Sequence, residues 1–111
     1  MTKELYLTSA PSKTGLVGVF EFDGDVAFYY LYDTVQGKGQ KILSSIRVFV
    51  GERNLDASNA KVIWNRTESA VGLSLDGVLC AVFDARGAKY GGDYNTGVQP
   101  SIPLEVLSSF R

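Results

Sequence analysis

The sequence VGVFEFDGD, at residues 17–25, is nearly repeated as VGLSLDG at residues 71–77. In both stretches apolar residues run up to an aspartate-glycine pair, and a second apolar run follows that ends at Asp33 or at Asp84. Such a pair favours a tight hairpin, because glycine adopts the positive φ of the turn without a Cβ clash. The two stretches therefore predict two β-hairpins. The distance along the chain between matching residues is not constant, so we interpret the likeness as shared hairpin chemistry rather than duplication.

Other strand patterns surround the two hairpins. Together they predict seven strands, at residues 5–8, 16–22, 26–32, 42–50, 61–65 and the two halves of 70–83. In the strand 42–50, period-two alternation predicts that Val48 and Val50 share one face and that Phe49 lies on the other. The short polar connections favour an antiparallel meander, closed as a small barrel or folded as a sandwich.

A short helix is predicted near the end of the chain. Ser101 offers a hydroxyl N-cap, Pro103 fits the first turn, and Glu105 places a negative charge near the positive end of the helix. The predicted apolar stripe of this helix consists of Leu104, Leu107 and Phe110. The expected architecture is thus one mainly-β domain over residues 1–111 with a single short C-terminal helix.

The composition narrows the classes of partner. The chain has 111 residues, of which 45% are apolar, and its 11 basic and 12 acidic residues give a net charge of −1. This balance leaves no basic stripe for nucleic acid, and no apolar stretch approaches the roughly 20 residues of a membrane helix. The single cysteine, Cys80, lies in an apolar run, which favours a buried structural thiol and a reducing compartment. Since residues 1–8 lack the apolar core of a signal peptide, we expect a soluble, cytoplasmic protein.

Histidine is absent from the sequence. Ser-His and Cys-His nucleophile pairs, imidazole zinc sites and the usual general base at neutral pH are therefore not available. An enzyme built from this chain would have to use carboxylates, tyrosines or lysines. We predict no catalytic residues, no metal site and no cofactor.

The glycine-rich segment 85–97 is the strongest candidate for a ligand site. It combines cations, tyrosines and a carboxylate, and such loops often recognise ligands, although a plain connecting loop is the alternative. The candidate ligand-binding residues are Arg86, Lys89, Tyr90, Asp93 and Tyr94, with Asp33, Asp84 and Glu21 as supporting carboxylates. The cations favour an anionic or polar small molecule.

Three tyrosines crowd the strand predicted at 26–32. Alternation sends Tyr30 and Tyr32 to one face and Tyr29 to the other. On an open sheet face they would form a binding or dimer surface, and core packing is the alternative. Trp64 is predicted to anchor the core.

Several segments together resemble a small family of uncharacterised bacterial proteins. The matching segments are LYLTSAP at 5–11, GLVGVFEFDGD at 15–25, Trp64, ESAVGL at 68–73, AVFD at 81–84, KYGG at 89–92 and Ile102-Pro103. That family is a domain of unknown function, so the resemblance implies a bacterial, stand-alone domain and no catalytic residues. A more general likeness connects the chain with orphan proteins of mobile integron gene cassettes.

These observations favour a non-enzymatic binding or protein-interaction module. We expect it to act as a homodimer through an exposed strand edge or aromatic face. One alternative is a small-molecule-binding protein or enzyme with a pocket rimmed by the segment 85–97. Another is an immunity-type protein that neutralises a toxin.

Overall fold

The structure is a computed structural model, and it describes residues 4–10, 15–34, 41–51, 54–91 and 102–110. Its elements are β1 (Leu5–Ser9), β2 (Leu16–Phe22), β3 (Val26–Asp33), β4 (Lys41–Val50), β5 (Ala60–Trp64), β6 (Ala70–Leu75), β7 (Val78–Asp84), β8 (Lys89–Gly91) and α1 (Leu104–Ser108).

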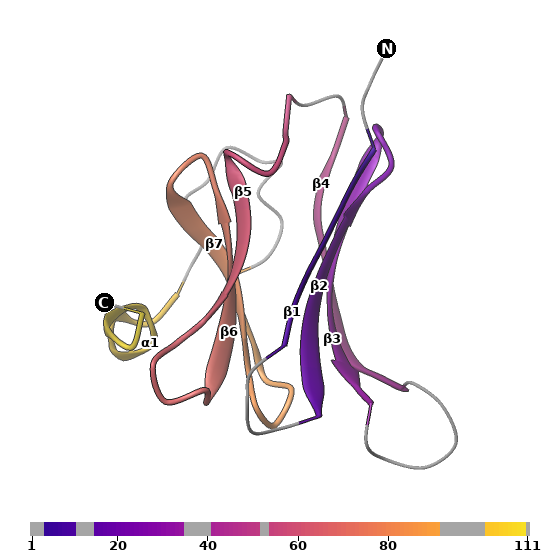
Figure 1. Cartoon of the computed structure of the whole chain (residues 1–111). Helices are drawn as coiled ribbons and strands as arrows, with labels where there is room; N and C mark the ends of the chain where they lie inside the picture. Colours follow the sequence, from indigo (N-terminus) through magenta and orange to yellow (C-terminus); the bar gives the residue numbers. More distant parts are fainter. Residues whose placement is uncertain (1–3, 11–14, 35–40, 52–53, 92–101, 111) are drawn as a thin grey trace.

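The strands form two antiparallel sheets that face each other. The first sheet has the order β1-β2-β3-β4 and the second the order β5-β6-β7-β8, and Figure 1 shows them as two layers with α1 outside the second. The mainly-β prediction is confirmed. Of the two predicted alternatives, a small barrel or a sandwich, the described strands form a sandwich of two sheets and not a closed barrel. The predicted number of seven strands is wrong, because Lys89–Gly91 adds an eighth strand along β7, with Tyr90 opposite Val82.

Each predicted hairpin supplies the two central strands of one sheet. In the second hairpin, Asp76 and Gly77 have φ values of 52° and 81°, as a two-residue primed turn requires. The first hairpin turns over three residues, 23–25. There the Asp23 carboxylate accepts hydrogen bonds from the backbone N–H groups of Asp25 at 2.9 Å and Val26 at 2.8 Å.

The hydrophobic core lies between the sheets. Phe20 and Leu73 are fully buried there, and the rings of Tyr29 and Phe83 stack with centroids 4.6 Å apart. Full burial of one such side chain contributes about 1.5–3 kcal/mol relative to exposure. Trp64, predicted to anchor the core, is only partly buried and packs against the core from its edge. Its indole N–H donates to the Ser9 carbonyl at 2.8 Å, which ties β5 to β1.

Strand β4 does not keep the predicted alternation. Ala27 lies opposite Phe49 but Phe28 lies opposite Arg47, so Val48 is an extra residue at a β-bulge. A bulge rotates the strand by one position. Phe49 is therefore buried beside Val48, while Val50 is 41% exposed, which contradicts the predicted faces.

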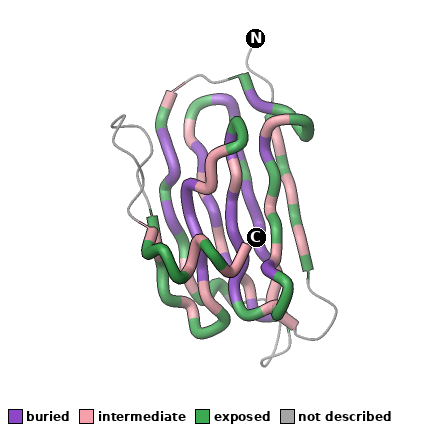
Figure 2. Tube along the Cα trace, turned by 90° about the vertical axis from the view of Figure 1, so that its left-hand side faces the viewer, coloured by how far each residue is buried: buried purple, intermediate pink, exposed green. Residues whose placement is uncertain are grey.

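The helix α1 lies against part of the outer face of the second sheet (Figures 1 and 2). The Phe110 ring lies over Gly72, and a Cβ at position 72 would come within 3.1 Å of it. Leu104 is 71% exposed, so the predicted apolar stripe is wrong at that residue. The predicted hydroxyl cap is not borne out either, since the N-cap residue is Pro103 without a side-chain cap hydrogen bond; Ser101 lies outside the described residues.

Among the described residues, no helix has the length and apolarity needed to cross a membrane.

Candidate functional site

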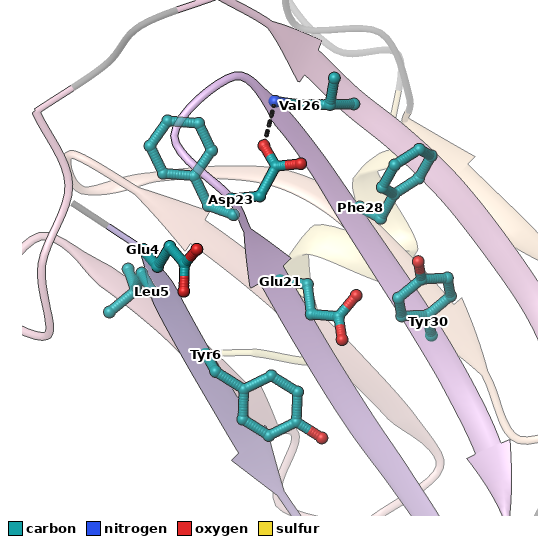
Figure 3. A pocket seen from close by; sticks show the side chains of 9 residues that line it. Glu4, Leu5, Tyr6, Glu21, Asp23, Val26, Phe28 and Tyr30 are labelled. Atoms are coloured by element: carbon teal, nitrogen blue, oxygen red, sulfur yellow. Dashed lines mark hydrogen bonds between the residues drawn. The ribbon is translucent and has the colours of Figure 1, made fainter. Parts of the chain in front are cut away.

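A hollow lies on the outer face of the first sheet, at the end of β1–β3 that holds the first hairpin turn. We call it the aromatic trough; its volume is about 580 Å³. It is lined by Glu4, Leu5, Tyr6, Glu21, Phe22, Asp23, Val26, Phe28 and Tyr30 (Figure 3). Three adjacent strands thus bring together residues that are distant in the sequence.

Strand register places a carboxylate between aromatic side chains. Tyr6 on β1 lies opposite Glu21 on β2, and Glu21 lies opposite Phe28 on β3. Because side chains alternate between faces, all three project outward. Figure 3 shows the Glu21 carboxylate lying between Tyr6 and Tyr30.

Phe28 and Tyr30 of β3 form the aromatic side of the trough, and Tyr32 continues the aromatic row beyond it. Phe28 and Tyr30 stack with centroids 6.0 Å apart, and Tyr30 and Tyr32 lie 5.8 Å apart in a tilted arrangement. Val19 on β2 lies opposite Tyr30 on β3. It is only 2% exposed although it does not belong to the core cluster between the sheets. The prediction that Tyr30 and Tyr32 share one face and Tyr29 the other is confirmed, with Tyr29 in the core.

The described lining carries three carboxylates and neither lysine nor arginine. The Asp23 carboxylate is engaged in the hairpin turn, where the backbone N–H groups of Val26 and Asp25 lower its pKa. Glu4 and Glu21 are exposed. Arg47 on β4 lies beyond Phe28, two strands from Glu21. The trough is therefore a locally acidic surface.

Partial burial and the negative charge of Glu21 raise the pKa of Tyr30. The neighbouring Tyr32 and a hydrogen bond with Glu21 contribute in the same direction. Tyr30 is consequently a neutral phenol at pH 7 and keeps an uncharged aromatic side chain in the trough lining.

A second hollow, of about 330 Å³, lies between α1 and the second sheet; we call it the helix hollow. Three of the predicted ligand-binding residues line it, namely Asp84, Arg86 and Tyr90, and Glu105 joins them from the helix. One Asp84 carboxylate oxygen accepts hydrogen bonds from the N–H groups of Arg86 at 2.9 Å and Ala88 at 3.0 Å. Asp84 thus shapes the turn that carries Arg86.

The other predicted residues do not line the helix hollow. The Lys89 ammonium donates to the Ser45 carbonyl on β4 at 3.4 Å. Asp33 ends β3 in the first sheet, where it lies opposite Lys41. Asp93 and Tyr94 lie outside the described residues.

Cys80 is fully buried, and its thiol donates to the Leu73 carbonyl at 3.4 Å, in keeping with the structural role predicted for it. Within the described part of the chain, no three carboxylate or thiol side chains lie close enough together to hold a metal ion.

Sequence reasoning missed Tyr6 and Glu4 as members of a site and treated Glu21 only as a supporting carboxylate. Their signal is the alternation of Glu4, Tyr6 and Thr8 on a short first strand. That signal acquires meaning only when β1 is known to pair with β2 in the observed register.

Comparison of the chain with curated proteins found no match, and comparison with solved structures found none either. A family model, DUF2251, described as an uncharacterized protein conserved in bacteria, matches residues 1–93. The match covers β1 to β8 and both walls of the aromatic trough, and it leaves α1 outside. The chain belongs to this family of uncharacterised bacterial proteins.

Proposed function

We propose that the protein is a non-enzymatic binding module and that the aromatic trough is its recognition surface. The observation that carries the proposal is the contrast between the two outer sheet faces. The second sheet has α1 packed against part of its outer face, whereas the first presents Tyr6, at 61% exposure, and the row from Phe28 to Tyr32. Aromatic side chains gathered on an open face are typical of binding surfaces.

The dimensions and the chemistry of the trough fit this role. Its volume of about 580 Å³ lies within the range of roughly 300–1,000 Å³ for small-ligand sites. Apolar side chains supply contact area, and a few polar groups, with Glu21 at the centre, would orient a ligand. Because the lining is held by three hydrogen-bonded strands, little conformational entropy is lost on binding.

A thermal-shift screen against small metabolites tests the proposal. A ligand at 100 times its dissociation constant stabilises the folded state by about 2.7 kcal/mol, which corresponds to roughly 10 °C or more in Tm for a domain of this size. We expect stabilising ligands to lose most of this shift in a Tyr6→Ala variant. Tyr6 is 61% exposed, so the variant itself should fold normally.

Ile63→Ala is the matched control, because Ile63 is 43% exposed on β5 of the other sheet. Its ligand shifts should equal those of the wild type. The proposal is wrong if every stabilising ligand acts equally on Tyr6→Ala and on the wild type.

The helix hollow supports a second candidate function, the binding of a small polar ligand. The favouring observation is that it gathers Arg86 and Glu105, charges of opposite sign, beside Tyr90. We expect a ligand of this site to lose affinity in Arg86→Gln and to be unaffected by Tyr6→Ala. Screening both variants in parallel therefore assigns each ligand to one hollow.

A further inference from the structure

We infer that the ligand of the aromatic trough is a small organic cation, an alkylated ammonium group seated over Glu21 between Tyr6 and the Phe28–Tyr30 pair. The inference rests on the proposed function, since it names the chemical class that this same surface would recognise.

The spacing of the strands supplies the geometry. Tyr6 and Phe28 lie on β1 and β3, one on each side of Glu21 on β2. Neighbouring strands are about 4.8 Å apart, which places the two aromatic Cα atoms roughly 10 Å from each other. A cation held above Glu21 would be attracted by either aromatic face wherever it comes within about 6 Å of that ring's centroid.

The negative charges of the lining favour a ligand with a positive charge. Glu4, Glu21 and Asp23 contribute three acidic groups, and the described lining has no basic residue to balance them. Among the described residues of this sheet, Arg47 lies opposite Phe28 and is separated from Glu21 by the strand that carries Phe28. An anionic ligand would meet uncompensated like charge, whereas a cation meets both a carboxylate and aromatic faces.

The chemistry of the lining favours an organic over an inorganic cation. Ca²⁺ and Mg²⁺ require about six or more oxygen ligands at short distance. In the described residues no three candidate ligands lie close enough together for a metal ion, and one of the carboxylates, Asp23, already accepts two backbone hydrogen bonds. An alkylated ammonium is weakly hydrated and needs only one carboxylate, and its methyl groups gain contact with Leu5, Val26 and the aromatic rings.

The shape favours a small molecule over a polypeptide. The hollow is confined to the ends of three strands around the first hairpin turn. It encloses about 580 Å³, the volume of a compact ligand. Beyond Tyr30 the strand β3 continues as the packed ring of Tyr32, and Tyr32 is not part of the lining.

Choline and its neutral carbon isostere, 3,3-dimethylbutan-1-ol, are the probes that test the inference. Both have the same shape, and only choline is charged. Titrations are followed by two-dimensional amide NMR and by calorimetry, with sodium chloride added to match the ionic strength. We expect choline to shift the amide signals of Tyr6, Glu21 and Tyr30, and to bind at least several-fold more tightly than the alcohol.

Two variants and one control complete the experiment. Removing one exposed cation–π partner or one exposed ion pair reduces affinity by about two- to fivefold, and this is the loss expected for Tyr6→Ala and for Glu21→Gln. Asp76→Asn removes an equivalent charge from the turn between β6 and β7 in the second sheet. Asparagine tolerates the positive φ of that position, and this control should leave choline binding unchanged. All three positions are exposed, so wild-type Tm values will show that the variants are folded.

The outcomes of these titrations distinguish the cationic class of the ligand from the proposed function of the trough. Equal binding of choline and the alcohol at the trough overturns the cationic class while leaving the proposed function in place. Shifts confined to other surfaces overturn the inference, and the proposed function falls as well only if no ligand of the thermal-shift screen depends on Tyr6. Tighter binding of a lysine-containing peptide than of choline would overturn the small-molecule choice and assign the trough to a protein partner.

Discussion

At the scale of single residues, Tyr29 holds the most unfavourable polar group in the described core. Its ring is fully buried and stacks on Phe83, but its hydroxyl has no hydrogen-bond partner among the residues that the structure describes. A buried, unpaired hydroxyl costs about 1–3 kcal/mol. Burial, and next the proximity of Cys80, raise the pKa of Tyr29 well above its ordinary value of 10.0.

We therefore expect Tyr29→Phe to raise the free energy of unfolding by about 1 kcal/mol at pH 7, measured by urea denaturation. The pH dependence has a defined sign. The folded-state pKa exceeds the unfolded one, so the unfolded chain releases the proton first, and stability is complete below pH 10 and falls above it. The contribution of Tyr29 to that fall is about 1.4 kcal/mol per pH unit, and it should be missing in the variant.

A decrease of more than about 1 kcal/mol in the free energy of unfolding of Tyr29→Phe at pH 7 would contradict this expectation. It would show that the hydroxyl has a hydrogen-bond partner.

Neighbouring tyrosines illustrate what could be predicted for single residues. Alternation correctly separated Tyr29 from Tyr30 and Tyr32, because the period of a strand is a local property. It could not say which side would be the core. That depends on the second sheet, which packs Phe83 against Tyr29 and leaves Tyr30 on the open face.

At the scale of secondary-structure elements, Gly18 controls how closely the two sheets approach. A Cβ at this position on β2 would lie 2.8 Å from a methyl group of Val71 and 2.9 Å from one of Val62. Valine is stiff at χ1, so these side chains cannot swing aside within the core.

We expect Gly18→Ala to lower the free energy of unfolding by about 1–3 kcal/mol, the usual cost of overpacking, measured by chemical denaturation. Combining it with Val71→Ala provides the control, because the smaller side chain makes room for the new methyl group. The double variant should lose less than the sum of the two single losses. Additive losses would contradict a direct contact between positions 18 and 71.

Local sequence patterns predicted the bounds of most strands. They did not predict the bulge in β4 or the short strand β8. The bulge at Val48 has no distinct sequence signal, and it exposes Val50 by shifting the register against β3. Strand β8 is three residues long within a glycine-rich segment. It exists because β7 offers an unpaired edge, which is a property of the assembled sheet and not of residues 89–91.

At the scale of the whole molecule, the half-exposed aliphatic residues suggest where copies would associate. Ile42 and Leu43 on the edge strand β4 are 49% and 39% exposed. Edge strands with apolar side chains favour pairing with another chain. Since we propose the aromatic trough as a ligand site, β4 is the edge that we expect to form the predicted homodimer.

Light scattering coupled to size exclusion tests this expectation. The wild type should elute as a dimer at high concentration, and a double Ile42→Lys, Leu43→Lys variant as a monomer with unchanged Tm. Ile63→Lys on β5, at 43% exposure, is the control and should remain dimeric. A monomeric wild type would contradict the dimer, and dissociation by Ile63→Lys alone would contradict the choice of β4.

The amino-acid sequence by itself determined that this chain forms antiparallel hairpins, where their turns lie, and that histidine chemistry is unavailable. These are local properties, set by the φ requirement of glycine, by the period of a strand and by composition. Only the tertiary structure decided that the hairpins form the centres of two opposed sheets and that α1 packs against part of one of them. It also decided that Tyr6, Glu21 and Phe28 become neighbours, because strand pairing joins side chains from three separate segments. The candidate site therefore lies on the first of the two similar hairpins. Its residues are neighbours because β1, β2 and β3 pair with one another, and not because they are close in the sequence.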